Sequence, residues 1–167
     1  MRGALDAYGE QREELASEGR VLPGALSSLR EFAMREGIRQ SVITGSIKEI
    51  AAIKAGAFGL SPFLDIANGS YGNPLMQRSL MMDAARRRSV DASGRPTPRE
   101  KTLVVADTVH DMQGAVDAGV HAVGVATGPN AVDELIYSGA EIALTSLEDI
   151  SELRKLIDAI ESGPAPA

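Results

Sequence analysis

Short apolar runs alternate along this chain with longer segments whose apolar residues recur at helical spacing. A run of four or five aliphatic residues predicts a buried strand, and apolar residues three and four positions apart predict one face of a helix. We therefore expect helices over residues 4–18, 25–35, 47–57, 76–88, 112–118, 131–138 and 149–161. We expect strands over residues 41–43, 64–67, 102–106, 121–126 and 141–144.

This alternation predicts an α/β fold. Strands that alternate with helices form βαβ units, in which right-handed crossovers cover both faces of a parallel sheet with helices. A chain of 167 residues with 44% hydrophobic residues can bury one core, so we expect one domain. In such sheets ligands bind outside the carboxyl ends of the strands.

Charge and composition exclude several classes of partner. A net charge of -6 argues against a nucleic acid or an anionic membrane, because phosphate groups attract a basic face. The basic cluster Arg86-Arg87-Arg88 lies in a predicted helix near Asp83, so we interpret it as a solvated helical face. No apolar run approaches the ~20 residues of a membrane span, and we expect no membrane partner. The absence of cysteine excludes disulfides and fits a cytoplasmic protein.

Two carboxylates follow the apolar run at residues 103–106. Asp107 ends that run, and Asp111 stands where the next helix begins. A carboxylate at a strand end beside a helix N-terminus is a common way to hold Mg²⁺ against a phosphate. Asp111 is also an ordinary first-turn acid that can cap the helix. His110 has no second histidine at ligand spacing, and the turn at residues 127–130 is interpreted as structural.

Polar residues also follow the first predicted strand. Thr44, Gly45 and Ser46 precede a helix, so their hydroxyls and amides can bind an anion. Alternatively, Ser46 and Glu49 form a capping box at the start of that helix. Arg78 opens a later helix, where it either neutralises a phosphate or lies on the surface.

Taken in their order along the chain, these motifs resemble the haloacid dehalogenase (HAD) superfamily, specifically its phosphoglycolate-phosphatase-like branch. The resemblance covers roughly residues 20 to 160 and implies a Rossmann-like, HAD-like parallel sheet. Ala106 and Val109 replace the more usual Gly and Pro of the acidic motif. The matching segments are Val42-Ile43-Thr44-Gly45-Ser46, Asn68-Gly69-Ser70-Tyr71-Gly72 leading to Arg78, the run VADTVHDMQGAVDAG from Val105 to Gly119, and Val123-Gly124-Val125-Ala126-Thr127-Gly128.

The resemblance also implies roles for individual residues. It implies that Thr44 and Gly45 bind a phosphoryl group whose charge Arg78 stabilises. Asp107, with Asp111, would orient Mg²⁺, and the ligand would be a small phosphorylated molecule.

The beginning of the chain departs from the family pattern. The family's nucleophile and general acid/base form an Asp-x-Asp-x-Thr motif on a first central strand, and a helical cap follows. This sequence contains no Asp-x-Asp, and Asp6 stands too near its start to end a buried strand. We expect residues 1–20 to be a remnant of the cap helix and linker, residues 21–161 to be the core, and residues 162–167 to be a disordered tail.

The absent strand has structural and functional consequences. In the family it lies between the strands predicted here at residues 41–43 and 102–106, so its loss leaves a gap of roughly 10 Å. Unpaired backbone in a sheet centre is costly, so either these strands pair directly or another segment or chain fills the gap. We therefore predict a rearranged sheet or a homodimer.

Covalent phosphoryl transfer requires a nucleophilic carboxylate, so we expect little or no turnover from this chain alone. Three hypotheses follow. In the first, the chain is a HAD-type phosphatase whose catalytic segment is absent from it, because of truncation, because of a misassigned start or because a separate partner supplies that segment. Alternatively it is a non-catalytic protein that binds a phosphorylated ligand or a protein, or a structural domain with relic motifs.

Overall fold

The structure is a computed structural model that describes residues 19–72, 77–91 and 93–163. The chain divides into two compact units, Met1–Leu75 and Met76–Ala167. Each unit consists of parallel strands connected through helices, which confirms the α/β fold class. The helix predicted over residues 4–18 lies outside the described residues. Among the helices described, none is long and apolar enough to cross a bilayer.

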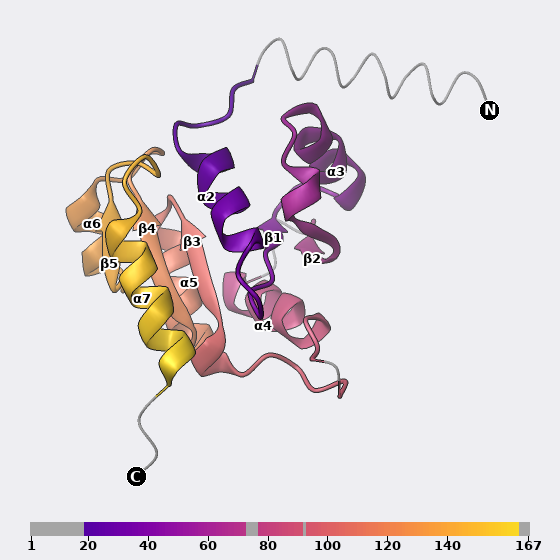
Figure 1. Cartoon of the computed structure of the whole chain (residues 1–167). Coiled ribbons are helices and arrows are strands. Elements are labelled where there is room, and N and C mark those ends of the chain that lie inside the picture. Colours follow the sequence, from indigo (N-terminus) through magenta and orange to yellow (C-terminus); the bar gives the residue numbers. More distant parts are fainter. Residues whose placement is uncertain (1–18, 73–76, 92, 164–167) are drawn as a thin grey trace. The chain divides into compact units, whose positions relative to one another are not determined.

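The first unit holds a two-stranded parallel sheet (Figure 1). The helices and strands of this unit follow one another in the predicted order. Gly24, with φ of 80°, turns the chain into the first helix. Phe32 on that helix is buried, as is Ile53 on the next. The described elements are α2 (Ala25–Ala33), β1 (Ser41–Thr44), α3 (Lys48–Ala57), the 3₁₀ turn η1 (Ser61–Phe63) and β2 (Asp65–Tyr71).

Strand β2 is longer than predicted because it contains an irregularity. Its register with β1 shifts between Ser41 and Ile43, and the additional β2 residues are held by local hydrogen bonds. The Asp65 carboxylate accepts from the Asn68 backbone N–H at 3.2 Å, and the Tyr71 hydroxyl donates to a backbone carbonyl nearby. The segment that resembles the start of the family's basic motif is therefore part of a strand.

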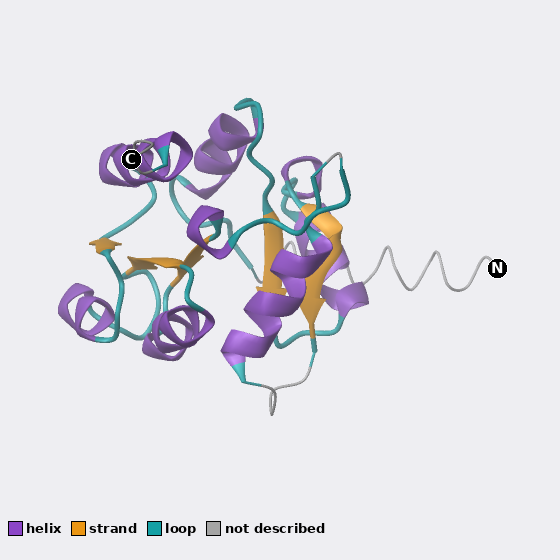
Figure 2. Cartoon of the chain, turned by 90° about the horizontal axis from the view of Figure 1, so that it is seen from below, coloured by secondary structure: helices purple, strands orange, loops and turns teal. Residues whose placement is uncertain are grey.

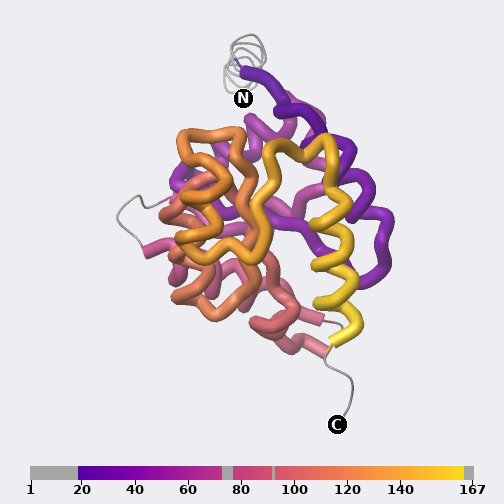
Figure 3. Tube along the Cα trace, turned by 90° about the vertical axis from the view of Figure 1, so that its left-hand side faces the viewer, coloured from indigo at the N-terminus to yellow at the C-terminus, as the bar shows by residue number. Residues whose placement is uncertain are grey.

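The second unit holds a three-stranded parallel sheet in the order β3-β4-β5. Helices lie on both sides of these strands (Figure 2), and the trace from β3 to the last helix can be followed in Figure 3. The described elements are α4 (Arg78–Arg88), η2 (Arg99–Lys101), β3 (Leu103–Ala106), α5 (Val109–Ala118), β4 (His121–Val125), α6 (Val132–Tyr137), β5 (Ile142–Leu144) and α7 (Ser151–Ser162).

The core of the second unit is built around β4. Residues 122–125 of this central strand are buried, because strands pair with it on both sides and helices cover its faces. Met112 from α5 and Leu135 from α6 are fully buried beside the sheet. Helix α4 packs on α5, and its Met81 and Met82 are also buried.

The basic cluster on α4 is only partly a solvated face. Arg87 exposes 65% of its side chain, as predicted, but Arg86 exposes 11%. Arg86 donates to the Asp83 carboxylate and to the Thr97 carbonyl, and Arg99 donates to the same carboxylate at 3.0 Å. The prediction was wrong for Arg86, because the loop after α4 folds back onto that residue.

The described strands form two separate sheets. The rearranged sheet expected from the sequence, which involves β1 and β3, stays a prediction. Strand β3 is an outer strand of the sheet β3-β4-β5. The homodimer and the boundaries of the core domain remain predictions.

Candidate functional site

The turn from β3 into α5 presents two of the predicted site residues. Thr108 is the N-cap of α5, and its Oγ1 accepts from the Asp111 backbone N–H at 3.1 Å. The Thr108 hydroxyl donates in turn to Asp111 Oδ2 at 2.6 Å. Thr108 therefore caps the helix, and the interpretation of Asp111 as its cap was wrong. Because Thr108 accepts a hydrogen bond from a backbone N–H of the first helical turn, α5 begins at Val109 rather than at the predicted residue 112.

A second turn supports the same helix start. The backbone N–H of Val109 donates to Asn130 Oδ1 at 3.2 Å, so the loop after β4 provides an acceptor at the N-terminus of α5. This contact confirms the structural interpretation of residues 127–130. Sequence reasoning missed the role of Asn130, since nothing local indicates which helix its amide would reach.

Arg78 and Asp111 lie together. Arg78 Nε is 3.0 Å from Asp111 Oδ1, and the two side chains expose 26% and 15% of their surfaces. Arg78 is the first residue of α4, as predicted, and Gly114 allows α4 to approach α5 here. Both oxygens of Asp111 are thus engaged, one by Arg78 and the other by Thr108.

The Asp107 carboxylate lies directly after β3 and is partly exposed. In the described part of the chain, no hydrogen bond or ion pair is made by this carboxylate. It packs against Gly128, where an added Cβ would overlap its Oδ2 and lie 2.7 Å from its Cγ. Gly128 therefore leaves the space that the Asp107 side chain occupies.

These two carboxylates differ in how well they suit a metal ion. Mg²⁺ is usually bound by one or two carboxylates, and water and phosphate oxygens complete its six ligands. Asp107 fits this pattern because its oxygens are open, whereas a metal at Asp111 would have to displace Arg78 or the Thr108 hydroxyl. Within residues 19–72, 77–91 and 93–163, no group of three or more His, Asp or Glu is arranged to hold a metal.

In the first unit, Thr44 is the last residue of β1 and Gly45 follows it. Thr44 Oγ1 accepts from the Ser46 backbone N–H at 3.1 Å, which shapes the turn into α3. The N-cap of α3 is Ile47, which makes no side-chain capping bond, so the predicted capping box of Ser46 and Glu49 was wrong. The first turn of α3 therefore has no side-chain cap.

Lys48 is a cation at this turn that sequence reasoning missed. It is the first residue of α3, and its Nζ donates to the Ala67 carbonyl at 3.2 Å. It also lies 5.9 Å from the centre of the Tyr71 ring. A lysine four residues after Thr44, in the first turn of the predicted helix, was the available signal.

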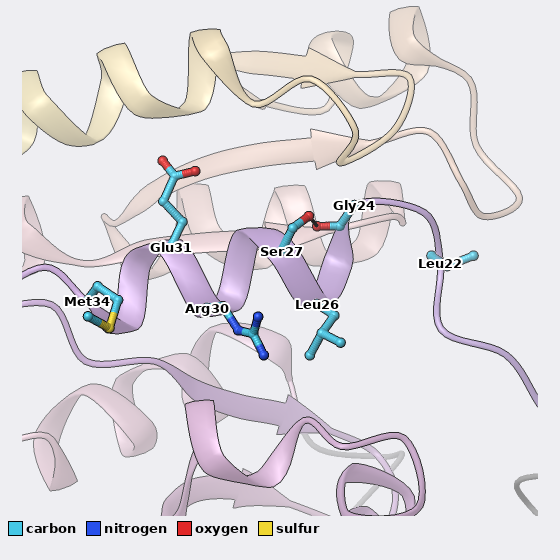
Figure 4. A pocket seen from close by; sticks show the side chains of 7 residues that line it. All are labelled: Leu22, Gly24, Leu26, Ser27, Arg30, Glu31 and Met34. Atoms are coloured by element: carbon cyan, nitrogen blue, oxygen red, sulfur yellow. Dashed lines mark hydrogen bonds between the residues drawn. The ribbon is translucent and has the colours of Figure 1, made fainter.

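A shallow hollow on α2 contains none of the predicted site residues. It is formed mainly by one side of that helix, where Leu26 and Met34 are exposed (Figure 4). Ser27 Oγ at its edge donates to the Gly24 carbonyl at 2.9 Å. We therefore place the candidate site at the strand ends rather than in this hollow.

Comparison with known families agrees with the motifs at the strand ends. The model of the haloacid dehalogenase-like hydrolases matches residues 1–115 of this sequence. The chain belongs to this family. The match includes β1, which ends at Thr44, and β3, which Asp107 follows, so the HAD resemblance inferred from the motifs is confirmed.

Solved structures share the HAD fold with this chain. A HAD hydrolase of family IA, variant 3, from Entamoeba histolytica has a TM-score of 0.72 and 17% identity, and the match covers 96% of this chain and 73% of that one. A putative beta-phosphoglucomutase from Bacteroides vulgatus has a TM-score of 0.66 and 19% identity, with 86% and 57% covered. A HAD family hydrolase from Deinococcus radiodurans has a TM-score of 0.59 and 22% identity, with 86% and 61% covered.

This HAD-family chain spans 57% to 73% of the lengths of these three structures. At identities of 17% to 22%, the likeness shows the fold alone. No curated protein matches the sequence.

Proposed function

We propose that this chain binds a phosphorylated ligand together with Mg²⁺ at the carboxyl end of β3, and that it does not hydrolyse a phosphate ester by itself. The observation that carries this proposal is the open Asp107 carboxylate at the turn from β3 into α5. On the first turn of α5, Asp111 forms an ion pair with Arg78 of α4. A carboxylate for the metal and a cation for the phosphate thus belong to the same unit.

Arg78 supplies the positive charge for a phosphoryl group. Asp111 accepts from its Nε, which fixes one edge of the planar guanidinium. The other nitrogens remain as donors to phosphate oxygens, apart from a long contact of 3.8 Å between Nη1 and the Met81 sulfur. In this proposal Asp111 is a positioning residue, because it acts through Arg78 rather than on the ligand.

Asp107 would hold the Mg²⁺. When bound, the ion supplies charge neutralisation at the phosphoryl oxygens. The Asp107 carboxylate suits this task because it is open and stands at a strand end, and Gly128 leaves room for it. The relative from Deinococcus radiodurans contains bound phosphate and sodium, which supports an anion and a cation as ligands of this fold.

The first unit has a turn of its own, after β1, that can bind an anion. The uncapped first turn of α3 offers backbone N–H groups to an anion, and the Thr44 hydroxyl hydrogen is free to donate because its oxygen accepts from Ser46. We propose, as the family resemblance implies, that Thr44 and Gly45 bind a phosphoryl group.

We expect no turnover from this chain because of the chemistry of the reaction. A covalent aspartyl-phosphate needs a nucleophilic carboxylate and a second acid/base group, which the family provides in an Asp-x-Asp pair. The sequence contains no such pair, and the proposal already assigns Asp107 and Asp111 other roles.

Titration calorimetry with inorganic phosphate in the presence of Mg²⁺ tests the proposal. We expect phosphate binding that weakens by about tenfold or more in Arg78→Gln, since a charged hydrogen bond contributes about 1.5–3 kcal/mol. Asp107→Asn should remove the dependence on Mg²⁺. Arg95→Gln and Asp117→Asn are matched controls, because both side chains are exposed on the same unit away from this turn, and they should bind like the wild type.

A phosphatase assay with p-nitrophenyl phosphate separates the alternatives. Binding without turnover supports the proposal, as a non-catalytic phospho-ligand-binding protein. Mg²⁺-dependent turnover that disappears in Asp107→Asn would overturn the claim of inactivity and show a phosphatase instead. Absence of phosphate binding would contradict the proposal and leave the third hypothesis, an interaction domain with relic motifs.

A further inference from the structure

Helices α4 and α5 are joined at a second place, away from the ion pair of Arg78 with Asp111. Arg99, in the 3₁₀ turn η2, donates from Nη2 to Asp83 Oδ1 of α4 at 3.0 Å. The Nη1 of the same side chain donates to the carbonyl of Ala118, the last residue of α5. One guanidinium therefore bridges the two helices.

Each contact of this bridge suits an arginine. The last carbonyls of a helix lack partners within it, and the helix dipole favours a cation there, so the Ala118 carbonyl is a good acceptor for a charged donor. A guanidinium presents several donors in one rigid plane, which allows it to bond to both helices at once. The Arg99 stem runs beside Gly119, where an added Cβ would lie 3.8 Å from its Cδ.

The bridge and the ion pair attach α4 to α5 at two separate points. Arg78 and Asp83 are five residues apart on α4, which is about 7.5 Å along its axis. Asp111 and Ala118 are seven residues apart on α5, which is about 10 Å. Gly114 brings the helices close together near the first point, since an added Cβ would lie 2.5 Å from the Arg78 Cβ. A single attachment permits α4 to pivot about this close contact, whereas two attachments oppose the motion.

We propose that Arg99 is a positioning residue for the phosphate site. By holding Asp83 against the end of α5, it fixes the direction of α4 and with it the Arg78 guanidinium at the start of that helix. The proposal rests on the proposed function, because it takes Arg78 as the group that binds phosphate. Arg99 acts through Arg78 and not on the ligand, and all the contacts involved lie within the second unit.

Arg87 provides a matched comparison. It donates from Nε to Asp83 Oδ2 at 2.6 Å, so it binds the same carboxylate as Arg99. It belongs to α4 itself, four residues after Asp83, and exposes 65% of its side chain. The bond of Arg87 to Asp83 therefore stays within α4, whereas the bonds of Arg99 connect α4 to α5.

Titration calorimetry of the full chain with inorganic phosphate and Mg²⁺ tests the proposal. Arg99→Met keeps the aliphatic stem and removes the bridge, so we expect phosphate binding to weaken by about three- to tenfold while circular dichroism stays native. Arg87→Met should bind within about twofold of the wild type. In an Arg78→Gln background, Arg99→Met should have no further effect on phosphate affinity, because it acts through Arg78.

A second readout needs no ligand. In heteronuclear NMR spectra the Arg78 Nε–H signal is identified by its loss in Arg78→Gln. The ion pair with Asp111 protects this proton from exchange with water. Arg99→Met should speed the exchange by about threefold or more, whereas Arg87→Met should leave it unchanged.

An unchanged exchange of the Arg78 Nε–H in Arg99→Met would overturn the proposal, and so would an unchanged phosphate affinity when the wild type binds phosphate. Equal losses in Arg87→Met, or further weakening by Arg99→Met in the Arg78→Gln background, would also overturn it, because both indicate a general loss of stability. A wild type that binds no phosphate contradicts the proposed function, and the proton exchange still decides whether Arg99 positions Arg78.

Discussion

Gly114 allows helices α4 and α5 to approach each other next to the candidate site. A Cβ at this position would lie 2.5 Å from the Arg78 Cβ and 3.3 Å from the Ser79 backbone nitrogen. Real Cβ atoms do not tolerate the first distance, and the obstructing atoms cannot rotate away because they belong to the backbone or are attached to it. We predict that Gly114→Ala destabilises the second unit, although alanine is the better helix former.

Two opposing effects decide the magnitude. Replacing glycine by alanine inside a helix stabilises by about 1 kcal/mol, whereas overpacking a tight core costs about 1–3 kcal/mol. Since α4 must move by about 1 Å to relieve the overlap, we expect the upper part of that range and a net loss of about 1–2 kcal/mol. Gly56→Ala is the matched control in α3: its nearest atom is Ser61 Oγ at 3.8 Å, so the same substitution should stabilise the first unit by about 0.5–1 kcal/mol.

Urea denaturation followed by circular dichroism measures both changes, with the two units fitted as separate transitions where they unfold separately. The displacement of α4 should also separate Arg78 from Asp111, so Gly114→Ala should weaken phosphate binding and Gly56→Ala should not. A Gly114→Ala variant as stable as the wild type, or more stable, would show that the helices are not held at this separation and would refute the reasoning.

Two further predictions concern the second unit. Hydrogen bonds from Arg87 and then from Arg86 lower the pKa of Asp83 to about 2. The ionised form of Asp83 therefore stabilises the fold at pH values above the unfolded pKa near 4, and this stabilisation is lost as the pH falls towards about 2. Urea midpoints measured between these two pH values should decline more in the wild type than in Asp83→Asn. Leu135 is fully buried, so Leu135→Ala should lower the free energy of unfolding by about 2–5 kcal/mol. Ile136 is 44% exposed, so Ile136→Ala should lower it much less. Equal losses of stability in thermal or urea unfolding would contradict the assigned core.

Much of the fold was predictable because its signals are local. Among the described strands, β1, β3, β4 and β5 were predicted at nearly their observed positions, since a short aliphatic run bounded by turns is recognised within a few residues. The start of α5 was missed by three residues, because Asp111 was interpreted as the cap. In the structure the cap is Thr108, whose side chain accepts a hydrogen bond from the Asp111 backbone N–H. The extension of β2 was missed because its irregularity depends on side-chain bonds to the backbone.

The candidate site was predictable as a set of residue types and not as an arrangement. Arg78 and Asp111 were both singled out from the sequence, but not as a pair, because they lie on different helices. The same holds for the contact of Asn130 with Val109 and for the room that Gly128 leaves.

By itself the sequence determined the class of fold, the order of its elements, the HAD family and the chemical character of each strand end. These follow from periodicity and from short motifs, which neighbouring residues specify. The tertiary structure alone decided which oxygens of Asp111 are engaged, that the Asp107 carboxylate makes no hydrogen bond or ion pair among the described residues, and that β3 is an outer strand of the sheet β3-β4-β5. Such features depend on distances between segments far apart in the chain, and a single added Cβ at Gly114 or Gly128 is enough to change them.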